Sequence, residues 1–166
     1  MKNVRSAKHG FSLVELVIVV VIIGVIAAIA VPRISRGARG AGDAALRGSL
    51  ASLRNAIDMY AAEHGGNFPD GADQAALEEK LIKKTDASGT INADPTKNIY
   101  GPYLRTGFPP LSVCTNKGSS EVEITTGEPA YTAGGKGWVY ATDTGKIIAN
   151  CADAETDEAG EKYNEY

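Results

Sequence analysis

The chain has 166 residues, which is enough for one folded domain with its own core and too few for two of ordinary size. Its formal net charge of −3 excludes the basic surface that general nucleic-acid binding requires, so we expect no nucleic-acid partner. Two cysteines also exclude a cysteine-only zinc site, and we expect no cofactor.

The N-terminal region joins a short basic leader to a long apolar run. The first ten residues carry three basic side chains and no acid, namely Lys2, Arg5 and Lys8. Residues 16–31 contain no charged residue, and with residues 11–14 the run reaches the roughly 20 residues that a helix needs to cross a bilayer. A lone strand in lipid leaves its backbone groups unpaired, so we expect a transmembrane helix over 11–32 in spite of the many β-branched residues.

Two processing routes are open for such an N-terminus. A secretory signal peptide fits the basic leader and the small residues Ala28 and Ala30, but its apolar region is usually only about 7–15 residues long. A retained anchor fits the length better. The leader favours a cytoplasmic N-terminus and an exported C-terminal domain, although the arginines at 33, 36 and 39 oppose that orientation.

The string GFSLVEL at residues 10–16 resembles the N-terminus of type IV pilins and pseudopilins, as do the basic leader before it and the apolar run after it. In that family a prepilin peptidase cuts between the glycine and the phenylalanine and methylates the new terminus. The resemblance implies cleavage between Gly10 and Phe11, N-methylation of Phe11, and assembly of many copies into a helical filament. Residues 1–10 would then be a leader peptide and residues 11–32 the transmembrane and assembly helix.

Glu15 is the one charged residue inside the apolar segment. A carboxylate at the bilayer centre costs about 2.5–3.5 kcal/mol on insertion scales, although near a helix end it can reach the interface. Cleavage before Phe11 creates an ammonium group one helical turn away. If subunits stack as the resemblance implies, Glu15 pairs with the Phe11 ammonium of a neighbour, worth up to about 4 kcal/mol at an effective dielectric of about 20. We therefore expect Glu15 and Phe11 to set the register of assembly.

Gly24 and Pro32 interrupt the helical pattern in the second half of the apolar run. Proline in a helix interior costs about 3 kcal/mol and glycine about 1 kcal/mol, so we expect a kink or local loosening between these two residues. In related pili this part of the helix loosens on packing into the filament, which makes Pro32 an expected assembly residue. A static kink explains the same sequence.

Residues 33–64 continue the helix with an amphipathic pattern. Apolar residues at alternating spacings of four and three form one stripe, which we expect to pack in the core: Leu46, Leu50, Leu53, Ile57 and Tyr60. Arg47, Arg54 and Asp58 lie off the stripe and are expected to face water or neighbours. The segment NAIDMYAAEHGGNFP at 55–69 resembles the corresponding part of the major type II secretion pseudopilins.

Residues 65–166 are predicted to form a globular head. The whole chain is then an α+β, pilin-like fold, in which the long helix packs on a small antiparallel β-sheet. A short helix is expected over 72–84. Turn-rich residues follow, and then four strand-like segments at 111–114, 120–126, 137–142 and 146–151. The last two flank Asp-Thr-Gly, which favours a compact hairpin.

Cys114 and Cys151 fall at the ends of the first and last of these strands. Oxidation is the normal fate of two such residues in an exported domain, so we expect one disulfide. Closing that loop contributes about 4 kcal/mol in the chain-entropy treatment. Two buried free thiols are the alternative.

The C-terminal residues 152–166 form an acidic tail, and blocks of like charge are usually solvated. Major pseudopilins often bind calcium in a C-terminal loop, and Asp143, Asp153 and Asp157 are oxygen donors of the correct kind. The sequence departs from that loop, because a tight hairpin and a strand lead directly into the tail. Calcium binding therefore remains an open alternative, and no metal ligands are assigned.

Catalysis is not expected from this sequence. Once the leader is removed, His64 is the remaining histidine, and it falls near a helix end. One histidine in that position offers no arrangement of nucleophile and base. The chain also lacks a phosphate-binding loop, so another protein must supply the energy for filament growth.

The sequence thus predicts a structural subunit of a pilin-like filament, preferably the pseudopilus of a type II secretion system. A surface type IV pilus for adhesion, motility or DNA uptake is the first alternative, and a membrane tether that never polymerises is the second. The expected partners are further copies of the chain, the prepilin peptidase, an inner-membrane assembly platform, a cytoplasmic assembly ATPase and minor pilins. The expected location is the bacterial inner membrane, crossed once, with the head in the periplasm and the filament periplasmic or extracellular.

Overall fold

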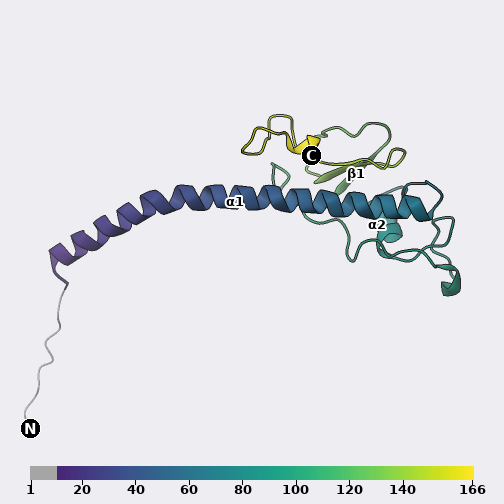
Figure 1. Cartoon of the computed structure of the whole chain (residues 1–166), viewed down its shortest axis with the longest axis horizontal. Helices are drawn as coiled ribbons and strands as arrows, with labels where there is room; N and C mark the ends of the chain where they lie inside the picture. Colours follow the sequence, from purple (N-terminus) through teal and green to yellow (C-terminus); the bar gives the residue numbers. More distant parts are fainter. Residues whose placement is uncertain (1–10) are drawn as a thin grey trace, which may run out of the picture. The chain divides into compact units, whose positions relative to one another are not determined.

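The computed structural model describes residues 11–166, apart from the side chains at positions 32, 35 and 36. The predicted leader, residues 1–10, lies outside the described residues. The chain divides into two compact units, residues 1–38 and 39–166, which are treated separately below. One helix, α1 (Leu13–Glu63), contributes to both, and all other helices and strands belong to the second unit (Figure 1).

In the first unit, α1 contains the apolar segment Leu13–Val31. These 19 residues have a mean hydropathy of 3.2, and none of them is buried. The helix continues through Gly24 and Pro32, so the expected loosening does not interrupt it in this structure. By length and composition the segment is suited to cross a membrane.

In the second unit, the later part of α1 supplies one wall of the hydrophobic core. All five residues of the predicted stripe are at most 2% exposed: Leu46, Leu50, Leu53, Ile57 and Tyr60. They pack with residues of a second helix, α2 (Gln74–Ile82), and of the sheet, including Leu77, Leu81 and Trp138. The prediction of a core-facing stripe is confirmed.

Helix α2 is shorter than the predicted 72–84. It begins after Asp73, whose carboxylate accepts a hydrogen bond from the Ala76 amide at 2.9 Å. Such a side-chain cap satisfies an amide that has no partner within the helix. The helix ends at Lys83, where the backbone becomes extended.

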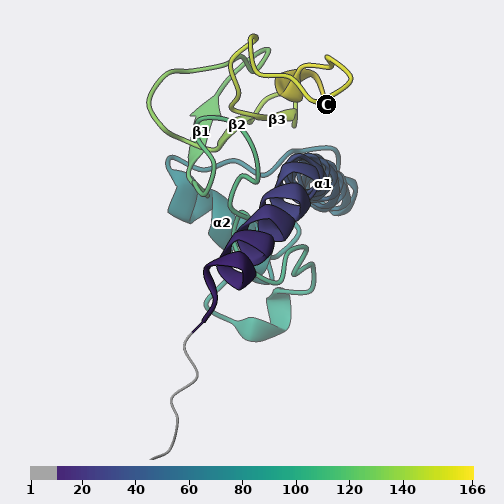
Figure 2. The ribbon, with the colours of Figure 1, turned by 90° about the vertical axis from the view of Figure 1, so that its left-hand side faces the viewer.

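The sheet has three strands in the order β1 (Val122–Thr125), β2 (Trp138–Ala141) and β3 (Ile147–Ala149). Figures 1 and 2 place it on one side of the later part of α1. Strands β2 and β3 are antiparallel, as the hairpin predicted. Strands β1 and β2 are parallel, so the α+β class is confirmed but the expectation of a purely antiparallel sheet is wrong. The connection over 126–137 has the roughly dozen residues that a parallel crossover requires.

The predicted strand at 111–114 is absent from the described structure. Its last residue, Cys114, has a left-handed backbone with φ of 68°. The segment instead closes a loop, in which the Leu111 amide donates to Ser119 and the Gly118 amide donates back to Leu111. A left-handed residue ends an extended strand, and the strand-like residue types of this segment did not reveal that conformation.

Each outer strand of the sheet has a backbone group that is bonded to a helix side chain. At β1, the Gln74 side chain accepts from the Val122 amide at 2.9 Å and donates to Ser120 O, just before the strand, at 3.1 Å. On β3, Arg54 donates to Ile147 O at 3.2 Å. The two helices thus supply partners for backbone groups that edge strands otherwise leave open.

The acidic residues 152–166, called the C-terminal strap below, fold back onto the second unit. A short bridge joins Thr156 to Lys162, and a single 3-10 turn, η2 (Tyr163–Glu165), packs against β3. The Tyr163 hydroxyl donates to Asp43 of α1 at 2.8 Å. The expectation of a solvated tail is therefore wrong.

Two arginines of α1 supply the charges that hold the strap. Arg47 lies 3.1 Å from both Asp157 and Glu161, and Arg54 donates to Tyr166 O at 2.6 Å. The carboxylate of Asp157 is only 7% exposed. Arg47 and Arg54 were expected to face water or neighbouring subunits, and the structure gives them partners in their own chain.

Candidate processing and assembly site

The helix α1 begins with a reciprocal pair of side-chain hydrogen bonds. The Ser12 hydroxyl accepts from the Val14 amide at 3.3 Å, and the Glu15 carboxylate accepts from the Ser12 amide at 2.9 Å. A serine followed three residues later by glutamate is the capping-box pattern of a helix start. Sequence reasoning treated Glu15 only as a charge in an apolar run, although the Ser12–Glu15 spacing already contained this second role.

Phe11 lies just before this cap and is 87% exposed. Gly10, on the other side of the predicted cleavage point, lies outside the described residues. Glu15 lies four positions after Phe11, which corresponds to about 6 Å along a helix axis. The hydrogen bond to Ser12 engages one oxygen of Glu15, and the other has no hydrogen-bond partner among residues 11–166. The second oxygen can therefore accept an ammonium group.

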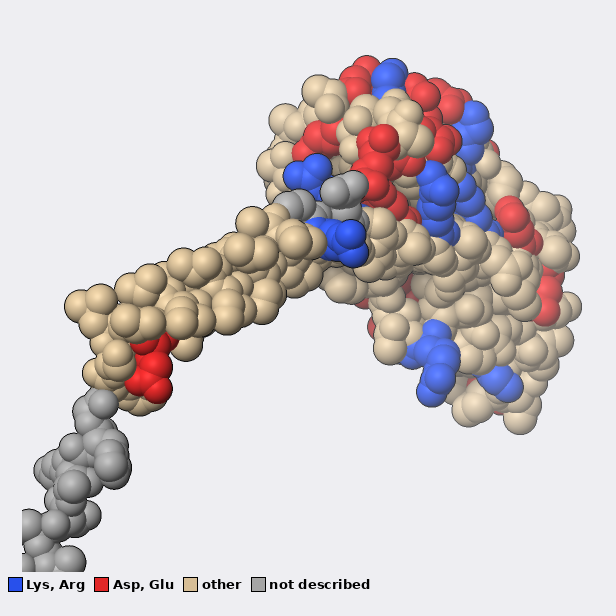
Figure 3. Space-filling model, turned by 60° about the vertical axis from the view of Figure 1, so that its left-hand side comes forward, with Lys and Arg blue, Asp and Glu red and all other residues tan. Residues whose placement is uncertain are grey.

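The surface that follows Glu15 is apolar on all sides of the helix. Between Leu16 and Val31 every large hydrophobic side chain is about half exposed or more, and Figure 3 shows this stretch as an unbroken uncharged surface. An exposed apolar surface of this extent marks a membrane or protein contact. Pro32, the third predicted assembly residue, lies within α1, and its role stays a prediction.

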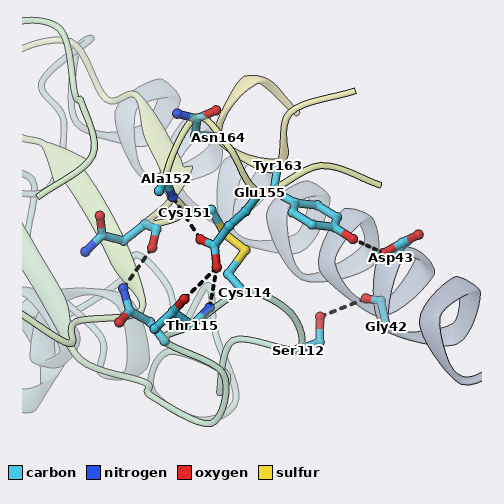
Figure 4. Close-up of a disulfide and its surroundings, with 12 residues drawn as sticks. Gly42, Asp43, Ser112, Cys114, Thr115, Cys151, Ala152, Glu155, Tyr163 and Asn164 are labelled. Atoms are coloured by element: carbon cyan, nitrogen blue, oxygen red, sulfur yellow. Dashed lines mark hydrogen bonds between the residues drawn. A yellow bond between two sulfur atoms is a disulfide. The ribbon is translucent and has the colours of Figure 1, made fainter. Parts of the chain in front are cut away.

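The two cysteines form the predicted disulfide, with Cα atoms 5.7 Å apart (Figure 4). Glu155 of the strap bonds to the residue after each cysteine. Its carboxylate accepts from the amide and hydroxyl of Thr115 at 2.7 Å each, and from the Ala152 amide at 2.9 Å. Partial burial raises the pKa of Glu155, but these hydrogen bonds outweigh it, so the pKa is lowered overall.

In the described part of the chain, one group of three potential metal ligands comes together, and it consists of Cys114, Cys151 and Glu155. The two sulfur atoms are bonded to each other, and the carboxylate is occupied by its hydrogen bonds. In the oxidised protein this group has no thiolate to offer a metal.

The three aspartates weighed as calcium donors are not brought together. Asp143 accepts from the Gly127 amide at 2.8 Å, Asp153 accepts from Asn164 at 2.8 Å, and Asp157 contacts Arg47. Each carboxylate thus has donors of its own. A calcium site would need several of these oxygens around one point.

His64 is buried at the end of α1, where each of its ring nitrogens has a polar partner. Its Nδ1 lies 2.7 Å from Tyr60 O, and its Nε2 lies 2.9 Å from the Thr85 hydroxyl. Tyr60 stacks on the ring at a centroid distance of 3.9 Å. These contacts join α1 to the segment that follows α2.

A comparison with family models gives one match. A model described as the prokaryotic N-terminal methylation motif matches residues 5–31, which span the Gly10–Phe11 junction, the capped start of α1 and the apolar segment. Neither the curated proteins nor the solved structures contain a match to the chain. The motif points to a structural subunit rather than an enzyme. Through residues 5–31 this chain carries the signature of the type IV pilins and pseudopilins.

Proposed function

We propose that this chain is the subunit of a pilin-like helical filament. The observation that carries the proposal is the methylation motif at residues 5–31, which includes the apolar helical segment Leu13–Val31 with no buried residue. Before assembly the segment Leu13–Val31 holds the subunit in the bacterial inner membrane, which the chain crosses once. In the filament the same surface packs against the helices of other copies.

Processing prepares the subunit for assembly. A prepilin peptidase cuts between Gly10 and Phe11 and methylates the new amine, which stays positively charged at neutral pH. That ammonium lies one turn before Glu15 and is matched to the carboxylate of an adjacent copy. The Glu15 oxygen that does not bond to Ser12 supplies the acceptor. The pair fixes the axial position of one subunit on the next.

The filament we favour is the pseudopilus of a type II secretion system, with the head in the periplasm. The support is the resemblance of residues 55–69 to the major pseudopilins. In this system the partners are an inner-membrane platform, minor pilins and a cytoplasmic ATPase. A surface type IV pilus uses the same N-terminal chemistry and is the second candidate.

The decisive experiment replaces Glu15 by alanine in the full chain. We expect the Glu15→Ala protein to be processed and retained in the membrane but to form no filaments, which electron microscopy and membrane fractionation would record. The matched control is Ser12→Ala, which disturbs the same helix cap but keeps the carboxylate. We expect that variant to polymerise.

The alternatives give different results in this experiment. A membrane tether that never polymerises would be indifferent to loss of Glu15, or would insert better without it. Normal filaments from Glu15→Ala would show that the carboxylate does not direct assembly. Loss of filaments in both variants would assign the effect to the helix cap.

A further inference from the structure

A strongly basic segment follows the apolar span. Residues 32–42 contain three arginines, at positions 33, 36 and 39, and no acidic residue, in a chain whose net charge is −3. The side chains of Arg33 and Arg39 are exposed, and neither forms an ion pair or side-chain hydrogen bond with the side chains that the structure describes. Arg47 and Arg54, on the same helix, are both bonded within the chain.

The end of the apolar segment sets the depth of this basic segment in a membrane. At a rise of 1.5 Å per residue, the 19 residues of Leu13–Val31 extend about 28 Å, close to the roughly 30 Å of a bilayer's hydrocarbon core. Arg33 follows only two residues later, or about 3 Å along the helix. With Val31 at the edge of the hydrocarbon, the guanidinium group of Arg33 is at the level of the lipid phosphates.

The three arginines do not help to orient the chain across the membrane. Basic residues favour the cytoplasmic side, so three arginines beyond the span work against the basic leader. A guanidinium group is suited to phosphate, because its planar donors bind two oxygens at once. Each basic residue near an anionic lipid surface raises binding about fivefold.

From these observations we propose that the basic segment 32–42, with Arg33 nearest the hydrocarbon, binds the phosphates of anionic phospholipids in the leaflet at the C-terminal end of the apolar segment. The inference rests on the proposed membrane placement of Leu13–Val31 and adds a specific lipid contact to it. The contact holds the subunit at a fixed depth and must be released when the subunit is extracted into the filament. Acidic groups of a second copy are the competing partner, and the test below separates them from lipid.

The test uses the full chain in nanodiscs of phosphatidylcholine containing a minor fraction of phosphatidylglycerol, with one subunit per disc. Lipids that stay with the subunit after mild extraction are counted by mass spectrometry. We expect phosphatidylglycerol to be enriched severalfold over the bulk composition, and the triple variant Arg33→Gln, Arg36→Gln, Arg39→Gln to lose that enrichment. The charge-matched control removes three exposed cations of the head, with Lys97→Gln, Arg105→Gln and Lys117→Gln, and should keep it.

Three results would overturn the proposal in different ways. Equal enrichment in the triple variant and the control would show that the arginines do not bind the lipid. Salt-sensitive pairing of two subunits in liposomes of pure phosphatidylcholine, a separate measurement from the single-subunit discs, would assign the arginines to a second copy if the triple variant loses it. A chain that a carbonate wash removes from the membrane would refute the membrane placement itself, and so the proposed function with it.

Discussion

Glu155 connects the two chain segments that the disulfide joins. Its carboxylate receives three hydrogen bonds, from Thr115 on one side and Ala152 on the other. Hydrogen bonds to a charged group contribute more than those between neutral groups. The carboxylate therefore works in parallel with the covalent bond between Cys114 and Cys151.

Replacing Glu155 by alanine should lower the free energy of unfolding by about 1–3 kcal/mol, because the amides that it accepts from lose their partner. Urea denaturation of the oxidised protein measures this change. Glu158→Ala is the matched control, since Glu158 is an exposed acid of the same strap with no side-chain hydrogen bond or ion pair in the described structure, and its loss should have little effect. Equal losses in the two variants would contradict the role of Glu155.

The strap should also respond to acid through Asp157. Hydrogen bonds from the Tyr166 hydroxyl and from backbone amides, together with Arg47, hold the pKa of Asp157 below its ordinary value of 3.8. A carboxyl group with a lowered pKa in the folded state contributes stability that is complete above pH 3.8. That contribution is lost as the pH falls through the lowered pKa.

We therefore expect the amides of residues 155–166 to lose protection below about pH 4, measured against the intrinsic exchange rate at each pH, while the core amides of β2 stay protected. Hydrogen exchange followed by mass spectrometry measures both. In Asp157→Asn the strap should exchange fast at neutral pH already. A pH-independent strap in the wild-type protein would rule out this carboxylate as its acid-sensitive contact.

At the level of elements, the strap depends on side chains of α1 that are more than 100 positions away in the sequence. Arg47 contacts Asp157 and Glu161, and its guanidinium group lies 4.3 Å from the centre of the Tyr166 ring. Methionine at this position keeps the apolar stem but removes every charged contact.

Arg47→Met should thus raise the exchange rates of the strap amides severalfold with little effect on the core, since exposed ion pairs contribute little to global stability. Arg105→Met is the control, because Arg105 is an exposed arginine of the head with no ion pair in the described structure. If both variants behave like the wild type, the tyrosine contacts alone hold the strap.

The disulfide also acts between elements, because it joins the loop before β1 to the chain just after β3. Replacing both Cys114 and Cys151 by serine should lower the free energy of unfolding by up to about 4 kcal/mol, the chain-entropy value for this loop. Denaturation under oxidising conditions measures the change. A loss below 1 kcal/mol would mean that the strap and Glu155 hold the loop closed on their own.

Elements differ in how much of them the sequence determines by itself. The core face of α1 was predictable, because helical spacing alone brings Leu46, Leu50 and Leu53 to one side. The parallel pairing of β1 and β2 was not, because it depends on the path of the connection over 126–137 rather than on residue alternation. The packing of the strap was not predictable either. A run of acidic residues has the same sequence pattern whether it is solvated or bonded to arginines far away in the chain.

For the whole molecule, the two candidate filaments differ in where the processed chain is found. We expect mass spectrometry to detect a peptide that begins with N-methylated Phe11. Abundance of this peptide in filaments sheared from the cell surface would favour a surface pilus, and its restriction to the membrane fraction would favour the pseudopilus. A chain that begins uncut at Met1 in every fraction would contradict the processing.

The outer strands of the sheet bear on how copies of this molecule can join. Gln74 bonds to the Val122 amide of β1 and to Ser120 O just before it, and Arg54 bonds to Ile147 O of β3, so a neighbour that paired along either strand would have to break one of these bonds. Many heads crowded side by side would otherwise risk fusing strand to strand into a cross-β aggregate. In the proposed filament this obstacle favours contacts between helices over strand pairing, and helix contacts of that kind are reversible.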